Sequence, residues 1–333
     1  MSILKFDTIR WGIIGVGNVT EVKSGPAFYK SKHSNLVAVM RRNAEKAANY
    51  AKRHNISKWY SNASELINDP EVDAVYIATP PDSHASYAIE VMRAGKPVYV
   101  EKPMARNFAE CVEMLKVSKE TGMPIWVAYY RRTLPAFLKA KELIETGAIG
   151  KPLVVNIKLY KQAQERNQTK EKMHWHVFPE ISGGGYFFDL ASHQFDYLDF
   201  IFGEVKHIKG NAKNLAGLYP AEDTVSGTWT HKSGVVGTGS WCFVVDKNSV
   251  TDEIEIIGEK GKISFPCFSP PGVLKLETSE GIIDMKFDNP PHVSQNLVQQ
   301  IVNELRGIEN CVSTGISAAR TSWVLDEMVK GYY

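Results

Sequence analysis

The fold is decided by residues 11–20, WGIIGVGNVT, where a short apolar run leads directly into two glycines. A Gly-x-Gly turn between a strand and a helix is typical of dinucleotide-binding proteins. Gly15 would permit the tight turn, and Gly17 would let a pyrophosphate approach the free N–H groups of the helix. Thr20 replaces the third glycine of that pattern, so we expect helix and strand to lie slightly apart. A glycine turn in an ordinary strand-helix unit is the alternative.

Outward from this turn, short apolar runs alternate with amphipathic segments through the first third of the chain. This rhythm predicts a parallel sheet with crossover helices, which is a doubly wound Rossmann domain over residues 1–128. The five expected strands are 11–14, 36–40, 74–77, 98–100 and 125–128.

Beyond residue 128 the strands follow one another with few helices between them. This predicts an α+β domain over residues 129–333 with a large, mostly antiparallel open sheet, for substrate binding and oligomerisation. Helices are expected at 135–146, 186–202, 293–304 and 319–328. The polar segment 158–172 is predicted to be a mobile loop, and it could act as a lid.

Composition excludes several classes of protein. Thirty-nine Lys and Arg balance 37 Asp and Glu in 333 residues, which argues against a nucleic-acid or anionic-membrane partner. No apolar run reaches the ~20 residues that cross a bilayer. The four cysteines form no C-x-x-C pair, so we expect reduced thiols and a cytoplasmic protein.

The residues after the second expected strand bear on the cofactor. An NAD site places an acid there for the ribose 2′-hydroxyl, whereas this chain has Arg41 and Arg42. Guanidinium groups bind phosphate oxygens well, so the pair favours NADP(H), with NAD(H) as the alternative. Two solvated arginines would be the plain structural explanation.

Two further positions have side chains suited to proton chemistry. Lys102 follows the expected strand 98–100, at the sheet edge where ligands bind in doubly wound folds. Its ammonium could stabilise an alkoxide. Asp189 and His193 are four apart in a predicted helix and share one face. A carboxylate beside an imidazole can raise its basicity, although a histidine on such an apolar helix could equally be a core residue.

Several motifs in order resemble the glucose–fructose oxidoreductase and inositol dehydrogenase family, Gfo/Idh/MocA, over nearly the whole chain. These are the glycine turn, ATPPDSH at 78–84, EKP at 101–103, YRR at 130–132 and GGG at 183–185 followed by Asp189 and His193. The resemblance implies a cis Lys102–Pro103 bond. It also implies that His193 moves the hydroxyl proton, that Asp189 binds or orients substrate, and that Lys102 completes the catalytic set.

The resemblance assigns further residues. Those predicted to bind the cofactor are Gly15, Gly17, Asn18, Val19, Arg41, Arg42, Thr79, Pro80, His84, Glu101, Lys102 and Arg131. Those predicted to bind substrate are Lys102, Arg131, Trp175, Asp189 and His193. We expect no metal, because His174 and His176 have no evident third ligand. His84 could instead cap the following helix.

Together these features predict an NAD(P)-dependent oxidoreductase that acts on a secondary hydroxyl or ketone of a sugar, cyclitol or polyol. One alternative is a dehydrogenase of a non-sugar substrate such as a dihydrodiol. The other is a non-catalytic NAD(P)-binding metabolite sensor. A homodimer or homotetramer is expected, because an exposed apolar sheet face would otherwise promote aggregation.

Overall fold

The computed structural model describes residues 7–167, 172–269 and 272–333, and the chain divides into two compact units. Unit 1 comprises residues 1–130 and 290–319, and unit 2 comprises residues 131–289 and 320–333. The predicted boundaries placed all of residues 129–333 in the second domain, whereas residues 290–319 return to unit 1. The return has a packing cause: Leu297, Ile301 and Val302 of helix α10 (Gln295–Leu305) are fully buried in a core of unit 1.

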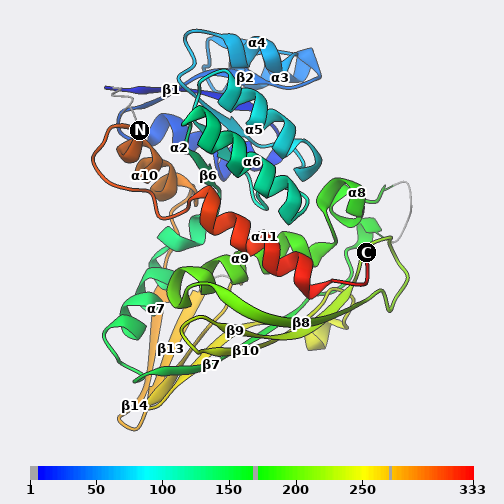
Figure 1. The fold of residues 1–333 in the computed structure, drawn as a ribbon, viewed down its shortest axis with the longest axis vertical. Coiled ribbons are helices and arrows are strands. Elements are labelled where there is room, and N and C mark those ends of the chain that lie inside the picture. The colour runs from blue at the N-terminus through cyan, green and yellow to red at the C-terminus, as the bar shows by residue number, and fades with distance from the viewer. Residues whose placement is uncertain (1–6, 168–171, 270–271) are drawn as a thin grey trace. The chain divides into compact units, whose positions relative to one another are not determined.

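Unit 1 is built on a six-stranded parallel sheet with the order β3-β2-β1-β4-β5-β6 (Figure 1). The strands are β1 (Ile9–Ile14), β2 (Ser34–Met40), β3 (Lys58–Tyr60), β4 (Ala74–Ile77), β5 (Val98–Val100) and β6 (Ile125–Val127). The strand order reverses between β1 and β4. Crossovers therefore leave this point in opposite directions, and in doubly wound sheets ligands bind at such a point, outside the carboxyl ends of the strands.

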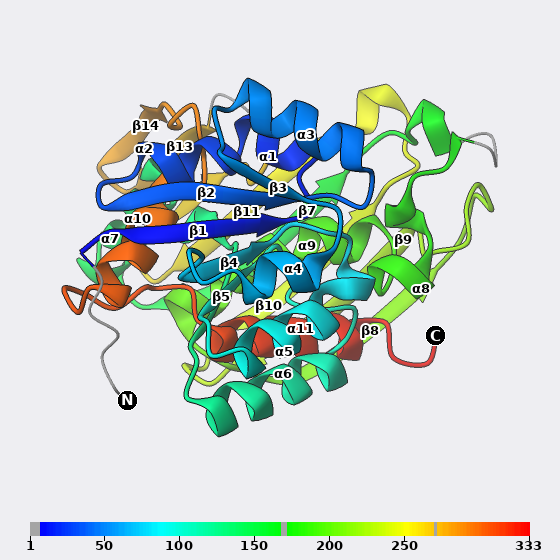
Figure 2. The same cartoon turned by 90° about the horizontal axis from the view of Figure 1, so that it is seen from above.

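Helices cover both faces of this sheet, as the doubly wound prediction requires (Figure 2). One core packs α4 (Ala63–Asn68), α5 (His84–Arg93) and α6 (Phe108–Thr121) against the strands. The opposite core contains α2 (Gly25–Lys30), α3 (Ala44–Arg53) and α10. Because both faces are covered, β4 and β5 are completely buried apolar runs.

Unit 2 contains an eight-stranded sheet with the order β14-β13-β12-β11-β7-β10-β9-β8. The β10–β7 pair is parallel and the other pairs are antiparallel, as predicted. The strands are β7 (Pro152–Tyr160), β8 (Val205–Lys213), β9 (Thr224–His231), β10 (Val236–Cys242), β11 (Thr251–Gly258), β12 (Gly261–Phe265), β13 (Gly272–Thr278) and β14 (Gly281–Phe287). The sequence pattern predicts strands in this unit at 153–160, 224–230, 235–242, 253–257 and 262–265, so β8, β13 and β14 were not predicted.

Helices of unit 2 include α7 (Pro135–Glu145), α8 (Pro179–Ser182), α9 (Tyr186–Phe202) and the later part of α11 (Gly315–Met328). The inner sheet face is apolar and includes Trp229 and Trp241, whose rings contact Phe195 of α9. Gly227 allows a close approach by α11, because a Cβ there would lie 2.5 Å from the sulfur of Met328.

The predicted mobile loop 158–172 begins differently from the expectation. Residues 158–160 are the end of β7, and a 3-10 turn follows at Glu165–Asn167. Residues 168–171 lie outside the described part of the chain. The predicted lid therefore lies partly outside the described residues.

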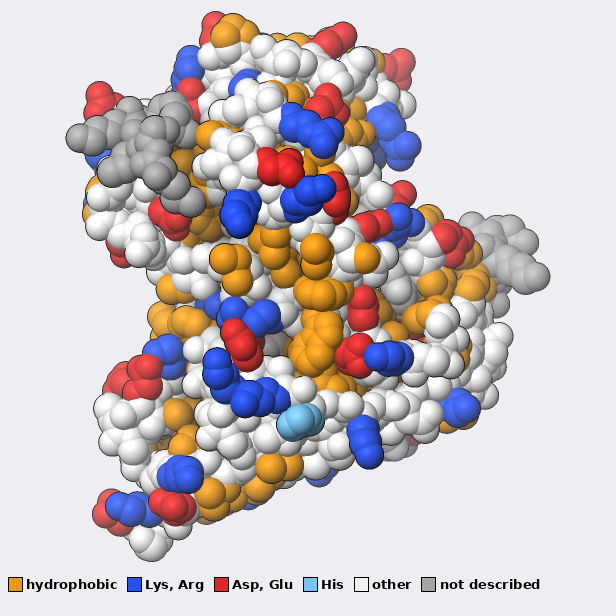
Figure 3. Space-filling view, in the orientation of Figure 1, with side chains coloured by type: hydrophobic (Ala, Val, Ile, Leu, Met, Phe, Trp, Pro, Cys, Tyr) orange, Lys and Arg blue, Asp and Glu red, His pale blue; other side chains and the backbone are white. Residues whose placement is uncertain are grey.

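The charged surface and the state of the cysteines can be compared with the expectations from composition. Basic and acidic side chains are interspersed over the face drawn in Figure 3. Within the described ranges, no helix is long and apolar enough to cross a bilayer. Cys111, Cys242, Cys267 and Cys311 are thiols rather than disulfides, and the cytoplasmic location stays a prediction.

Candidate active site

The glycine turn is fixed against two neighbouring strands of unit 1. Gly15 has φ +95°, and a Cβ there would lie 2.9 Å from the backbone nitrogen of Thr79, so the position requires glycine. The N–H groups of Gly15 and Val16 both donate to the carbonyl of Met40 at the end of β2. At Gly17 the nearest atom to a built Cβ is 3.9 Å away, which leaves open space beside the turn.

Thr20 acts differently from the prediction that it would hold helix and strand apart. Its buried hydroxyl accepts from the N–H of Gly17 and donates to the carbonyl of Gly17, both at 2.9 Å. The helix α1 (Asn18–Val22) is short, and Tyr50 donates to the Thr20 carbonyl at 2.8 Å. Gly25 permits the close packing, because a Cβ there would lie 2.0 Å from that carbonyl oxygen.

These contacts leave two N–H groups for an anion. Among the described residues, the backbone N–H groups of Asn18 and Val19 at the start of α1 donate to no partner. They adjoin the open space at Gly17, and the helix dipole favours negative charge there. The turn therefore fits a pyrophosphate group, which these residues would hold.

Other predicted cofactor residues follow the ends of adjacent strands. Gly15, Arg41, Thr79 and Lys102 come after β1, β2, β4 and β5, which are neighbours at one sheet edge. The Thr79 hydroxyl accepts from Ser83 at 2.8 Å. The topology thus brings to one edge four positions that the sequence separates by up to 87 residues.

His84 has a role in the protein interior. The ring is completely buried, with Nε2 2.8 Å from the Thr79 carbonyl oxygen and Nδ1 3.0 Å from the Pro103 carbonyl oxygen. Burial lowers the pKa of the imidazole. His84 therefore joins the loop after β4 to the loop after β5, and its ring has no exposed surface with which to touch a cofactor.

Glu101 and Lys102 adjoin this connection. Tyr76 donates a hydrogen bond to the buried carboxylate of Glu101, which also accepts from the N–H of Lys102 at 3.2 Å. The Lys102–Pro103 bond is cis, as the family resemblance implied. Lys102 itself is partly exposed.

A pocket of about 380 Å³ lies beside α1 and α3 in unit 1. Its lining residues are Glu21, Arg41, Glu45, Lys46, Asn49, Tyr50 and Arg53. Arg53 forms a two-pronged ion pair with Glu21, which lowers the pKa of that carboxyl to about 2. Arg41 and Lys46 form no ion pair with another described residue, whereas the exposed Arg42 does not line the pocket.

In unit 2, α9 carries Asp189 in its first turn and His193 one turn later. His193 is 3% exposed, and its ring contacts Phe268 edge-on at 5.9 Å. The preceding glycines serve protein packing. Gly183 ends α8 with φ +86°, and a Cβ on Gly184 would lie 2.1 Å from the ring of Phe188.

Trp175 belongs to a stack of aromatic rings beside Asp189. Its ring lies 3.7 Å from that of His176, which in turn stacks on His174. Nε2 of His176 is 3.6 Å from the Asp189 carboxylate, and the Nδ1 atoms of the two histidines are in contact. Across the described residues, no group of three or more His, Cys, Asp or Glu has the arrangement of a metal site.

Arg131 is buried in unit 2. Its Nε donates to the carbonyl of Cys267 at 3.0 Å, and its guanidinium lies 4.4 Å from the centre of the Phe268 ring. Asp252 accepts from the N–H groups of Cys267, Phe268 and Ser269, so this loop is held from two sides. Arg131 thereby supports Phe268, the neighbour of His193. No motif in the sequence points to Phe268.

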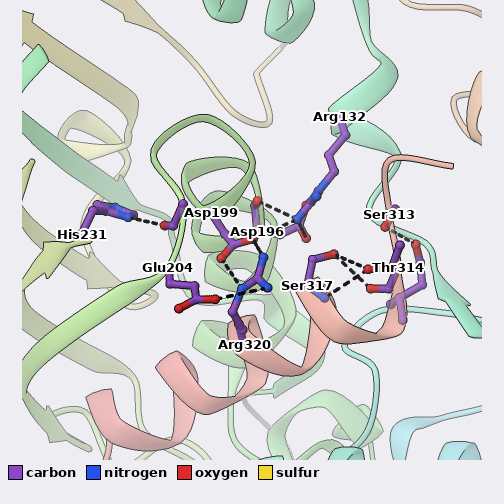
Figure 4. Close-up of polar contacts among 11 residues, drawn as sticks. Arg132, Asp196, Asp199, Glu204, His231, Ser313, Thr314, Ser317 and Arg320 are labelled. Carbon is purple, nitrogen blue, oxygen red and sulfur yellow. Dashed lines mark hydrogen bonds and ion pairs between the residues drawn. The ribbon is translucent and has the colours of Figure 1, made fainter. Parts of the chain in front are cut away.

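The later part of α9 is fixed by buried charge (Figure 4). Arg132 donates to both carboxylate oxygens of Asp196, at 2.8 and 2.7 Å. One turn on, Asp199 accepts two bonds from Arg320 of α11. Burial raises the pKa of Asp196 to about 6 although Arg132 opposes the shift. Nδ1 of His231 donates to the Gly203 carbonyl oxygen at 2.7 Å, just past the helix end.

Family comparison agrees with this architecture. Residues 9–129 match the model described as an oxidoreductase family with an NAD-binding Rossmann fold. Residues 137–264 match the Gfo/Idh/MocA C-terminal domain. The chain belongs to the Gfo/Idh/MocA family of oxidoreductases.

Three curated relatives are similar along most of their length. Oxidoreductase P35 of Formosa agariphila is 43% identical, over 88% of this chain and 90% of its own. The 1,5-anhydro-D-fructose reductase of Ensifer adhaerens is 26% identical, over 92% and 91%. The trans-1,2-dihydrobenzene-1,2-diol dehydrogenase of Bos taurus is 29% identical, over 79% and 76%.

Solved structures have the same fold. A Thermotoga maritima oxidoreductase superposes with a TM-score of 0.84 at 26% identity, over 97% of this chain and 96% of that one. The nucleotide unit and the sheet unit therefore occur together in this family, and the chain is an NAD(P)-binding oxidoreductase.

The buried pair on α9 gives a stability prediction. We expect Asp196→Leu to lower the free energy of unfolding by about 3–5 kcal/mol, because it removes the two-pronged partner of a buried guanidinium. The double variant Arg132→Met/Asp196→Leu should recover at least half of that loss. Urea unfolding followed by tryptophan fluorescence measures both. A double variant as unstable as Asp196→Leu would contradict this account of the pair.

Proposed function

We propose that the chain transfers a hydride between the nicotinamide of NADP(H) and a secondary hydroxyl or ketone carbon of a sugar, cyclitol or polyol. The observation that carries the proposal is the set of polar residues at the carboxyl edge of the unit 1 sheet, in a chain of an oxidoreductase family. The similarity to a 1,5-anhydro-D-fructose reductase supports a sugar-like substrate.

In this proposal the residues divide into two groups. Gly15, Gly17, Asn18 and Val19 hold the pyrophosphate, and Arg41, Thr79 and Lys102 follow strands that end at the same sheet edge. When bound, the nicotinamide supplies the hydride.

The second group moves the proton and binds the substrate. His193 accepts the hydroxyl proton during oxidation and returns it during reduction. Asp189 orients the substrate hydroxyl and, through His176, is itself kept in place. The ammonium of Lys102 stabilises the negative charge that develops on the substrate oxygen.

The catalytic assignment predicts a loss of turnover. We expect Lys102→Ala and His193→Ala each to lower kcat at least ~100-fold while the cofactor Kd changes less than ~3-fold. Reduced-nicotinamide absorbance is followed with aldoses, inositols, polyols and 1,5-anhydro-D-fructose. His207→Ala, at an exposed site on β8, is the matched control. Full turnover in both active-site variants would refute the assignment.

A dihydrodiol substrate is the second candidate, and the bovine relative supports it. Adding trans-1,2-dihydrobenzene-1,2-diol to the same panel separates the two candidates. Tight cofactor binding without turnover of any compound would favour the metabolite sensor instead.

The preference for NADP(H) is proposed from the pocket beside α3. Arg41 and Lys46 offer two cations to a ribose 2′-phosphate. The negative charge of Glu21, which also lines the pocket, is neutralised by its ion pair with Arg53. Arg42 lies outside the pocket lining, so its share of phosphate binding should be smaller.

We therefore expect Arg41→Asp to weaken NADPH binding at least ~30-fold more than NADH binding, because it removes a phosphate partner and adds repulsion. Arg42→Asp is the matched comparison and should have the weaker effect. Fluorescence titration with both reduced cofactors measures the affinities. Equal losses of NADPH and NADH affinity in Arg41→Asp would mean that no 2′-phosphate is bound there.

Assembly into a homodimer or homotetramer is also proposed, with the outer face of the eight-stranded sheet as the contact. The prediction assumed an apolar face, but the outward positions of β9 and β10 include Ser226, Thr228, Thr238 and Ser240. Exposed apolar side chains on the strands of this sheet include Leu153, Val236, Ile282 and Ile283. The argument from an exposed apolar face is thus weaker than the sequence suggested.

Light scattering after gel filtration at micromolar concentration should give two or four times the chain mass. A monomer mass would overturn the proposed assembly.

A further inference from the structure

Glu222 is a completely buried carboxyl group just before β9, and the proposed chemistry does not use it. Its Oε1 and Oε2 lie 2.8 and 2.9 Å from the backbone nitrogen of Gly185, which donates to them. The Tyr333 hydroxyl hydrogen-bonds to Oε2, and the N–H of Glu222 points at the same hydroxyl oxygen at 3.4 Å. All of these residues belong to unit 2.

Gly185 is the residue that makes this contact feasible. A Cβ at Gly185 would lie 2.6 Å from the Glu222 carbonyl oxygen and 3.0 Å from the Ala221 Cβ. Gly185 is also the N-cap of α9, and its carbonyl accepts from Phe188 and Asp189. Glu222 therefore accepts from the N–H of the N-cap residue, a bond that a Glu or Gln at the third helical position makes in a capping box and that Phe188 at that position cannot make.

We propose that Glu222 and Tyr333 form a clasp that positions the first turn of α9, and that the clasp closes best when the Glu222 carboxyl is protonated. Glu222 and Tyr333 are positioning residues, because they act on Asp189 and His193 through the backbone of the helix. The inference goes beyond the proposed reaction and does not depend on its substrate.

Electrostatics supports the direction of the pH effect. Burial, the largest cause, raises the pKa of Glu222 to about 7, while Tyr333 and the Gly185 N–H oppose the shift. The adjacent Asp223 raises it further, and the phenols of Tyr219 and Tyr332 are the other titratable groups nearby.

The sign follows from proton linkage. The Glu222 carboxyl of the closed clasp binds its proton more tightly than an exposed glutamate, whose ordinary pKa is 4.5. Closing is therefore favoured at low pH, and that advantage is lost as the pH rises through about 7. In the protonated form Oε1 still accepts from Gly185 and the acid proton can go to the Tyr333 oxygen.

Hydrogen exchange at amides 185–189 of the full chain tests the clasp. After division by the chemical exchange rate, the native protein should exchange there roughly tenfold faster at pH 8 than at pH 6. Glu222→Gln, which keeps the shape and stays neutral, should exchange slowly at both values, with less than a ~2-fold change. Tyr333→Phe should exchange at least ~3-fold faster than the native protein at pH 6.

Two controls separate the clasp from general effects. Glu280→Gln changes an exposed acid in the β13–β14 turn, and Tyr332→Phe changes the neighbouring phenol. Both should keep the native pH response.

A native exchange rate independent of pH, or the same response in Glu222→Gln, would overturn the proposal. Should Glu222→Gln not fold, the native pH response together with Tyr333→Phe decides the question. Because no substrate or cofactor is added, failure of the clasp is distinguishable from failure of the proposed reaction.

Discussion

Buried carboxyl groups at both ends of α9 are the constraint on which the candidate catalytic face depends. At its start, the Glu222 carboxyl meets the Gly185 N–H. Toward its end, Arg132 holds Asp196 and Arg320 holds Asp199. Taking such groups out of water is unfavourable unless they are paired, so the helix has one satisfied placement. Asp189 and His193 lie on the helix between these contacts, which therefore determine where the two side chains are placed.

The nucleotide unit depends on close backbone contacts rather than on charge. Gly15 lies against Thr79, while the Gly15 and Val16 N–H groups share the Met40 carbonyl. His84 then connects the Thr79 loop to the segment around the cis Lys102–Pro103 bond. Four loops that follow neighbouring strands are thus held together by backbone carbonyl contacts. This leaves the N–H groups of Asn18 and Val19 for a ligand.

Local pattern predicted the strands and helices whose periodicity is strong, among them α9 with its bounds. It missed β14, whose residues are mostly exposed and show no alternation, and it missed the return of α10 to unit 1, which only tertiary packing decides. Site residues with motif spacing could be named from sequence. Glu222, Phe268 and the pairing of Arg132 with Asp196 could not, because their partners are distant in the chain and their burial is set by the fold. The contacts of His84 with two loops could not be predicted either, since burial rather than spacing decides them.

The central claim is that this family member moves a hydride directly to or from a carbon of a sugar-like substrate. The most direct measurement uses NADPH with deuterium at both hydrogen positions of nicotinamide C4, with 1,5-anhydro-D-fructose or the best ketone from the substrate panel, and mass spectrometry of the product. The account predicts one deuterium on the new carbinol carbon, and no such product from His193→Ala at equal enzyme and time. A reduced product that contains no deuterium, or deuterium released into water, would contradict it.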